Sequence, residues 1–499
     1  MLWCSIPELS LCIGLIMIIL YGLFSLSIPG SPSSSHNVLL NVGTNLDRSA
    51  SLNLVNLSLN DVYFFSRLWP FMLLLGYMVD FNPIENNSGF FINVTNAVAF
   101  PGNNGIDLLL IFLTVVIMQS FKSFESVLLL LLAFVGQLFM LHSCDLVSFY
   151  ICLEAQNFCF LVLCALQPRA FKANMARGSR PLAGVEASIK YLLLSAFSSG
   201  VLLFWFSVLY LRTGITTLSW GPLTSNAFDL TQADSILDVV PQMLILIALM
   251  FKLGGAPLHI WMVDIYGGVK RQLLMVLSTA PKLSLFGFWV STWHSVWTDM
   301  TVLLFVVLSM VIGCIGAYNQ PTLRAMFAYS TINEIGLMLM AIETAGFHSL
   351  FQHLTIYIIT MLLLWNQTDK RLFSIIAVSL AGLPPLAGFF GKAWVFNSVA
   401  NGALAGPYLG VLVISLICTC LSLVYYLRVF RLFTMNESVL TKNSIYPAGT
   451  ETSVGISYLM SIQSRTYGSS SIDVHVKLTS FCIIFLVFAP LFYLKPFVL

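Results

Sequence analysis

Apolar residues run through most of this chain in stretches about as long as a membrane is thick. A helix needs about 20 residues to cross a hydrocarbon layer of roughly 30 Å. Fourteen stretches approach that length, at residues 9–27, 63–79, 106–120, 126–141, 146–166, 185–211, 239–261, 273–293, 302–318, 323–341, 349–365, 373–396, 403–429 and 476–494. The alternating pattern of a membrane barrel is absent from the sequence, and a helix satisfies its own backbone hydrogen bonds in lipid. The pattern therefore predicts an all-α polytopic membrane protein with about fourteen transmembrane helices.

Basic residues between these stretches predict the orientation of the chain. Sixteen of the 23 Lys and Arg residues lie in or beside the connections that follow odd-numbered helices, whereas Arg212 alone lies in an even-numbered connection. Connections rich in Lys and Arg stay on the cytoplasmic side of a membrane, or on the matrix side in a mitochondrion. Both termini are therefore expected on the opposite side.

Composition excludes several classes of protein. With 58% hydrophobic and 9% charged residues, the chain lies far from the roughly 25% charged residues of a soluble domain. A net charge of +2 leaves no basic surface for nucleic acid. The ten cysteines form no CxxC or Cys/His cluster, which favours apolar helix residues over a disulfide frame or a metal site. The start, Met1 to Glu8, lacks the basic region of a signal peptide, so we expect synthesis inside the compartment where the protein works.

Lysines inside the apolar stretches are the main candidates for chemistry. On insertion scales, a lysine at the centre of a membrane helix costs about 2.5 to 3.5 kcal/mol of insertion free energy. Three such lysines therefore cost on the order of 8 to 10 kcal/mol, unless partners or water offset this cost. The alternative for each is a lysine that reaches the membrane interface or neutralises a buried acid. For Lys190, four residues after Glu186, an ordinary surface pair is a sufficient explanation. The cations within or near helices are Arg67, Lys190, Lys252, Lys282 and Lys392.

Two acids and three histidines also fall within apolar stretches. Glu154 stands well inside its predicted helix, where a carboxylate needs a cation or a proton, and Glu334 lies midway along the tenth helix. A packing role for Glu334 is an equal alternative. His259, His348 and His353 titrate near neutral pH in principle, but a structural role is favoured for each.

Two predicted helices are interrupted by glycine and proline beside a lysine. The seventh contains Gly254, Gly255 and Pro257 after Lys252, and the twelfth contains a Gly-Leu-Pro-Pro run before Lys392. Proline removes a backbone donor, so each break frees carbonyls at mid-membrane that can line a polar cavity. If helices four to eight and nine to thirteen are two units, the break falls in the fourth helix of both, as in inverted-repeat transporters.

The organisation predicted from these features has five regions. Residues 1–125 form a three-helix region with polar loops, and residues 126–295 and 296–432 form the first and second five-helix repeats. A polar loop follows at 433–475, and a last transmembrane helix occupies 476–499. The polar stretches 29–61 and 434–473 are expected to be surface loops or partner contacts.

Several motifs resemble the antiporter-like membrane subunits of respiratory complex I, the family that includes subunit 2 of mitochondrial NADH dehydrogenase and the bacterial N subunit. One is the Phe-Lys-x4-Pro-x-His-x-Trp run at 251–261, followed by Asp264. The others lie at residues 153–156, 186–191, 195–200, 280–282, 324–332 and 382–389. The motifs span roughly residues 141–432 in the order of the family.

The resemblance implies a proton-translocating unit with a relay at mid-membrane. By matching motif, Glu154 pairs with Lys252, Lys282 lies on the central hydrated axis and Lys392 serves the other half-channel. A lysine that alternately loses and regains a carboxylate neighbour can pass a proton on. Lys190, His259 and Glu334 are weaker candidates for the same relay.

The sequence departs from the family at three places. The family usually has a His and a Tyr in Ser-x-x-His-x-Gly-Tyr on the tenth helix, whereas residues 330–337 here read Ser-Thr-Ile-Asn-Glu-Ile-Gly-Leu. Because of that change, the sequence leaves open which residues carry protons in the second half of the relay. The connection at 366–372 is shorter than usual and the loop after the thirteenth helix is longer, which suggests accessory subunits docked on the long loops.

The resemblance implies a membrane subunit of the proton-pumping NADH:ubiquinone oxidoreductase in the inner mitochondrial membrane. No cofactor is expected in this chain, because it has no Rossmann, haem or iron-sulfur motif; flavin, iron-sulfur clusters and ubiquinone are expected in other subunits. Expected partners are the other membrane-arm and accessory subunits and lipids such as cardiolipin, but not nucleic acid. The alternatives are a related cation/proton antiporter subunit and a structural scaffold of the membrane arm.

Overall fold

The computed structural model describes residues 14–17, 19–20, 104–121, 123–143, 145–166, 183–213, 216, 236–290, 299–344, 346–366, 370–402 and 406–434. Several predicted features lie outside these ranges, namely most of the first helix, the helices at 63–79 and 476–494, Arg67, the polar stretch 29–61 and nearly all of 434–473.

The chain forms two compact units, residues 1–166 and 167–499. In the first unit, α5 (Phe124–Leu141) packs against α4 (Asn104–Met118) and α6 (Leu146–Leu166). Gly136 allows a close approach between α5 and α6, because a Cβ there would lie 3.2 Å from the carbonyl oxygen of Cys152.

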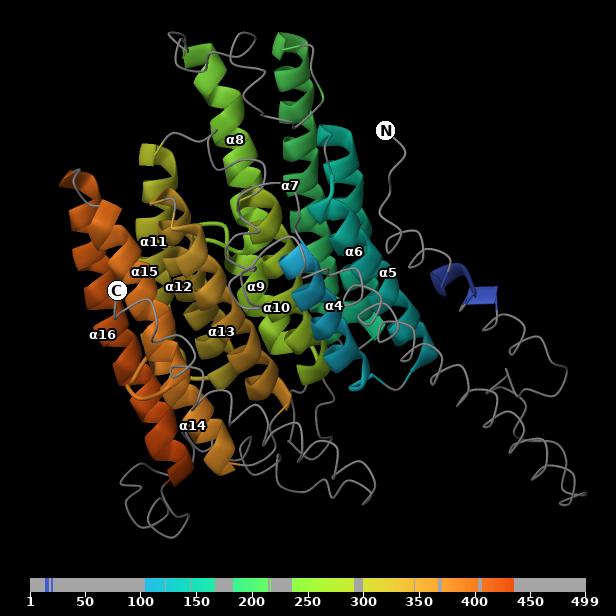
Figure 1. Ribbon diagram of the computed structural model, residues 1–499. Helices are drawn as coiled ribbons and strands as arrows, with labels where there is room; N and C mark the ends of the chain where they lie inside the picture. Colours follow the sequence, from blue (N-terminus) through green and yellow to red (C-terminus); the bar gives the residue numbers. More distant parts are fainter. Residues whose placement is uncertain are drawn as a thin grey trace, which may run out of the picture. The chain divides into compact units, whose positions relative to one another are not determined.

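The second unit is a bundle of ten helices in the described ranges (Figure 1). Neighbours along the bundle are α7 with α8, α10 with α13, α11 with α12, and α14 with α16. The bounds are α7 Ala183–Thr213, α8 Ile236–Leu253, α9 Ile260–Gly268, α10 Arg271–Phe288, α11 Asp299–Asn319, α12 Leu323–Glu343, α13 Phe347–Asn366, α14 Lys370–Ala381, α15 Ala387–Gly402 and α16 Gly406–Thr434. The all-α prediction is confirmed for the described elements.

Seven of the described helices are long and apolar enough to cross a membrane. They contain Phe124–Leu141, Leu146–Leu166, Val185–Leu211, Thr301–Asn319, Leu323–Glu343, Phe347–Asn366 and Tyr408–Phe433. Three shorter apolar segments are Ile106–Met118, Met243–Leu253 and Leu372–Ala381. The chain is therefore a membrane protein, while the count of fourteen helices, the five-region division and the inverted repeat stay predictions.

Both interruptions predicted from glycine and proline are present. The first separates α8 from α9, and the second separates α14 from α15. Gly254 (φ 79°) and Gly382 (φ 83°) directly follow α8 and α14, in the left-handed conformation that commonly ends a helix and favours glycine. The Ala256–Pro257 and Pro384–Pro385 peptide bonds in the two breaks are cis.

The predicted end of the seventh helix, at residue 261, is wrong. The second half of that broken helix is α9, which continues to Gly268. Met262, Ile265 and Tyr266 are buried along it, so tertiary packing stabilises the helix beyond residue 261.

Glycines bring α11 and α12 close together. A Cβ at Gly313 would lie 2.7 Å from the backbone nitrogen of Asn333, and one at Gly336 would lie 3.2 Å from the backbone nitrogen of Met310. Small residues allow such close backbone approach between membrane helices. This contact fixes the segment of α12 that carries Glu334.

Candidate functional site

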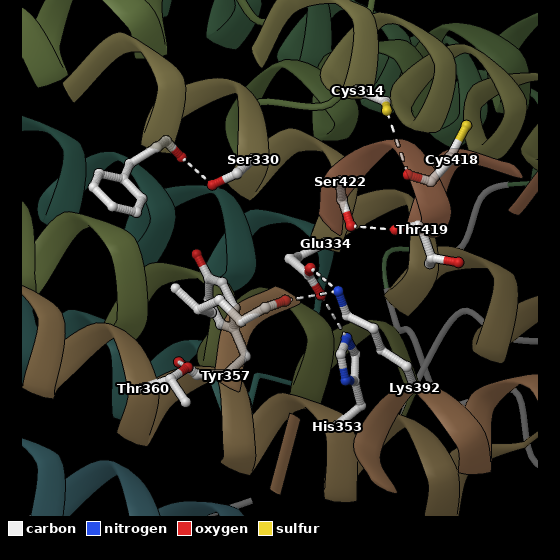
Figure 2. Close-up of polar contacts among 12 residues, drawn as sticks. Cys314, Ser330, Glu334, His353, Tyr357, Thr360, Lys392, Cys418, Thr419 and Ser422 are labelled. Atoms are coloured by element: carbon white, nitrogen blue, oxygen red, sulfur yellow. Dashed lines mark hydrogen bonds and ion pairs between the residues drawn. The ribbon is translucent and has the colours of Figure 1, made fainter. Parts of the chain in front are cut away.

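A buried carboxylate between two bases lies in the second unit. Glu334 of α12 has its Oε1 atom 2.9 Å from Nζ of Lys392 on α15, and its Oε2 atom 3.0 Å from Nε2 of His353 on α13. Figure 2 shows the lysine and the imidazole ring approaching this carboxylate. All three residues are buried, so three helices contribute one titratable group each to a site closed to bulk solvent within this chain.

The break between α14 and α15 positions Lys392. Its ammonium donates a hydrogen bond to the carbonyl oxygen of Leu380, at 2.9 Å, near the end of α14. The last carbonyls of a helix have no partner within the helix, and here the lysine supplies one. A Cβ at Gly382 would lie 3.2 Å from the Cδ atom of Lys392, so the glycine leaves room for the lysine side chain.

Lys282 lies in the middle of α10 and is 3% exposed. Its ammonium donates to the hydroxyl oxygen of Tyr357 at 2.7 Å and lies 4.8 Å from the centroid of that ring. Tyr357 is four residues after His353 on α13, and residues at this spacing share a helix face. One face of α13 therefore carries a contact to Lys282 and a contact to Glu334.

Lys252 lies in the last turn of α8 beside the other break and is buried. Its ammonium donates to the carbonyl oxygen of Ser195 on α7, at 3.3 Å. The indole nitrogen of Trp261 donates to the carbonyl oxygen of Phe251 at 2.9 Å. At both breaks a side chain thus donates a hydrogen bond to a carbonyl near the end of the preceding helix, to Phe251 in α8 and to Leu380 in α14.

The weaker candidate Lys190 lies on an exposed face of α7. Its ammonium is 3.2 Å from a carboxylate oxygen of Glu186 and 3.2 Å from one of Asp264 on α9. The i,i+4 ion pair with Glu186 is present as the spacing predicts, and Asp264 is a second partner that the helical spacing did not indicate.

Glu154 lies in α6 of the first unit, where it is half-buried and its Oε1 atom accepts a hydrogen bond from Asn157 at 3.1 Å. Lys252 belongs to the second unit, so the expected pairing of these two residues stays a prediction.

The remaining histidine candidates contact uncharged groups. His259 is buried at the start of α9 and packs edge-to-face on Tyr329 of α12, with ring centroids 5.5 Å apart. Nε2 of His348 lies 2.9 Å from the amide nitrogen of Gln352 one turn further along α13.

Sequence reasoning missed two members of the site. It favoured a structural role for His353 and did not single out Tyr357. The available signal was their spacing, because residues 353 and 357 fall on one face of a helix that is apolar enough to cross a membrane. Among the residues that the structure describes, no group of three or more His, Cys, Asp or Glu is placed to hold a metal ion.

Comparison with known proteins gives a consistent result. A family model described as NADH:quinone oxidoreductase/Mrp antiporter, transmembrane, matches residues 143–369. NADH-ubiquinone oxidoreductase chain 2 of Chlamydomonas reinhardtii is 45% identical over 494 residues, which cover 99% of this chain and 100% of that protein. NADH-quinone oxidoreductase subunit N 1 of Acidiphilium cryptum is 30% identical over 358 residues, 64% of this chain and 71% of that protein. A chain of respiratory complex I from Thermus thermophilus shares the fold, with a TM-score of 0.65 at 21% identity over 96% of this chain and 97% of that one.

Proposed function

Since the chain belongs to the family of NADH-ubiquinone oxidoreductase chain 2, we propose that it is the proton-translocating membrane subunit of that type in complex I. Protons cross it through a relay of Glu154, Lys252, Lys282 and Lys392. The family model also describes Mrp antiporters, but the full-length match to a chain 2 protein favours the complex I subunit over an antiporter subunit.

The main support for this proposal is a set of three buried lysines. Lys252 and Lys392 lie beside the two helix breaks, and Lys282 lies between the breaks along the sequence. Lys252, Lys282 and Lys392 are each at most 9% exposed, in a chain with 9% charged residues. Intramembrane ionisable residues of this kind mark ion and proton pathways in membrane proteins. A scaffold needs only apolar packing at these positions, so the retained charges favour transport.

The described contacts give the second half of the relay a physical basis. Lys282 is bound to a hydroxyl, whereas Lys392 is bound to a carboxylate and a helix carbonyl. A nearby negative charge favours the protonated form of a lysine, and its loss favours release of the proton. Changes in the distance between the lysines and their acidic partners therefore move protons along the row.

The reaction that drives this movement belongs to other subunits. The proposal assigns no redox cofactor to this chain and places the flavin, the iron-sulfur clusters and ubiquinone elsewhere in the complex. It places the chain in the inner mitochondrial membrane with both termini on the intermembrane-space side, in contact with other membrane-arm and accessory subunits and with lipids such as cardiolipin.

Substitution of Lys282 or Glu154 by alanine in the assembled complex tests this proposal. Coupled NADH oxidation with ubiquinone should fall, while NADH oxidation with an artificial acceptor should be unchanged. Lys270→Ala is the matched control, because Lys270 is an exposed lysine just before α10 and should leave both activities intact. Equal coupled rates in the Lys282, Glu154 and control variants would contradict the relay.

A further inference from the structure

His353 has the geometry of a proton carrier rather than of a packing residue. Its Nε2 atom lies 3.0 Å from a carboxylate oxygen of Glu334, at ion-pair distance, and neither this atom nor the buried Nδ1 atom has a hydrogen-bond partner among the described residues. A neutral imidazole has one nitrogen that accepts a proton and one that can release it. The ring is therefore oriented with Nε2 toward the Glu334 carboxylate and Nδ1 away from it.

The neighbouring helix fits closely around this ring. A Cβ at Gly391 of α15 would lie 2.9 Å from Nδ1 of His353, so the imidazole packs directly on the backbone beside Lys392. Ser349 lies one helical turn before His353 and donates to Ser398 of α15 at 3.0 Å. Polar groups therefore continue along this face of α13 beyond the histidine.

The Glu334 carboxylate can neutralise only one of the two bases, Lys392 or His353, at a time. Among side chains with described burial in the second unit, Glu334 is the only buried carboxylate, and it contacts both Lys392 and His353. One carboxylate neutralises one cation, and an unpaired buried charge is costly. The other titratable groups that interact with its charge are Lys282 and the buried tyrosines Tyr357, Tyr425 and Tyr426.

From this geometry we infer that His353 is the proton acceptor for Lys392 and that the Glu334 carboxylate bridges the two. The inference rests on the proposed function and deepens it by adding a residue and a step to the relay.

The step conserves atoms and charge. The Lys392 ammonium transfers a proton to the carboxylate, which becomes a carboxylic acid. Rotation about the Cγ–Cδ bond of Glu334 presents the O–H group to Nε2 of His353, which takes the proton. An N–H bond of Lys392 breaks and an N–H bond of His353 forms, so a lysine–carboxylate pair becomes a carboxylate–imidazolium pair without another reactant.

Replacement of His353 by glutamine in the assembled complex tests the step. The glutamine amide can donate a hydrogen bond to Glu334 but does not carry a proton, so a purely structural role would survive. We expect coupled NADH oxidation to fall at least about tenfold, since loss of a positioned proton carrier slows a transfer by about a hundredfold or more. Artificial-acceptor oxidation should not change. The control, His348→Gln, makes the same exchange on the same helix at a residue that contacts Gln352, and should retain coupling.

A Lys392→Met variant separates this inference from the proposed function. Loss of coupling in Lys392→Met together with normal coupling in His353→Gln would overturn the role of His353 and leave the relay standing. Normal coupling in both variants would overturn both. If His353→Gln lowers assembly, His353→Ala supplies the test: added imidazole should restore coupling in it, and pyrazole, a ring of the same size but a much weaker base, should not. Failure of imidazole to restore any coupling would contradict the inference.

Discussion

The Glu334 carboxylate of α12 and the Lys392 ammonium of α15 form a buried ion pair, 2.9 Å apart and 58 positions apart along the sequence. It joins the middle of one helix to the second half of a broken helix. In the proposed relay this pair holds the proton at Lys392 until the carboxylate turns to His353.

Removal of the carboxylate should affect both assembly and coupling. Glu334→Gln leaves Lys392 buried without its partner, and breaking a buried pair in this way costs about 3 to 5 kcal/mol. The amount of assembled complex on a native gel should fall, and so should coupled NADH oxidation.

The double variant Glu334→Gln with Lys392→Met separates the two effects, because it removes both charges together. Assembly should recover in it and coupling should not. Recovery of coupling would show that the charged pair is structural only.

The hydroxyl of Tyr357 should matter through its contact with Lys282. Tyr357→Phe removes the acceptor at 2.7 Å and keeps the ring under the ammonium. A hydrogen bond to a charged group is worth about 1.5 to 3 kcal/mol, so we expect a coupled rate lower by roughly tenfold, measured against artificial-acceptor oxidation in the same membranes. An unchanged coupled rate would exclude Tyr357 as a functional contact of Lys282.

Space at Gly391 should be needed for the orientation of His353. In Gly391→Ala the added methyl group would lie 2.9 Å from Nδ1, so the ring must shift and its contact with Glu334 should weaken. Coupled NADH oxidation should fall. Gly410→Ala is the matched control on α16, because no atom lies within 4 Å of a Cβ there, and helix glycines replaced by alanine gain about 0.5 to 1 kcal/mol. Equal coupling in the two variants would contradict a fitted site for His353.

Alanine substitutions of Lys190 and Lys252 should lower coupled NADH oxidation to different extents. Lys190 is paired on an exposed face, whereas Lys252 is buried beside the first helix break. Lys252→Ala should therefore depress coupled oxidation much more than Lys190→Ala, when both are normalised to artificial-acceptor oxidation. The reverse order would move the first half of the relay to the exposed cluster of Lys190, Glu186 and Asp264.

The helices and breaks were predictable because their signals are local. Long apolar stretches and the glycine–proline runs near Lys252 and Lys392 predict α8, α9, α14 and α15 from neighbouring residues alone. The end of α9 was not predictable in this way, since the residues beyond 261 are held in the helix by burial of Met262, Ile265 and Tyr266 in the folded bundle.

The candidate site was only half predictable because its contacts join distant helices. A histidine in a membrane helix is most often structural, so the sequence did not indicate that His353 faces Glu334. The hydroxyl of Tyr357 and the carbonyl of Leu380 become partners of lysines only in the folded bundle. Glu334 itself was predicted as a candidate because an acid at mid-helix in a membrane is costly without a partner.

A high-resolution map of the intact membrane complex tests the proposed relay most directly, because it shows whether protons have a path between the relay residues. We predict a continuous row of ordered water and polar side chains from Glu154 through Lys252 and Lys282 to Lys392. An axis plugged by apolar side chains between these residues, in a complex that is active in coupled NADH oxidation, would contradict the relay and assign proton transport to neighbouring subunits.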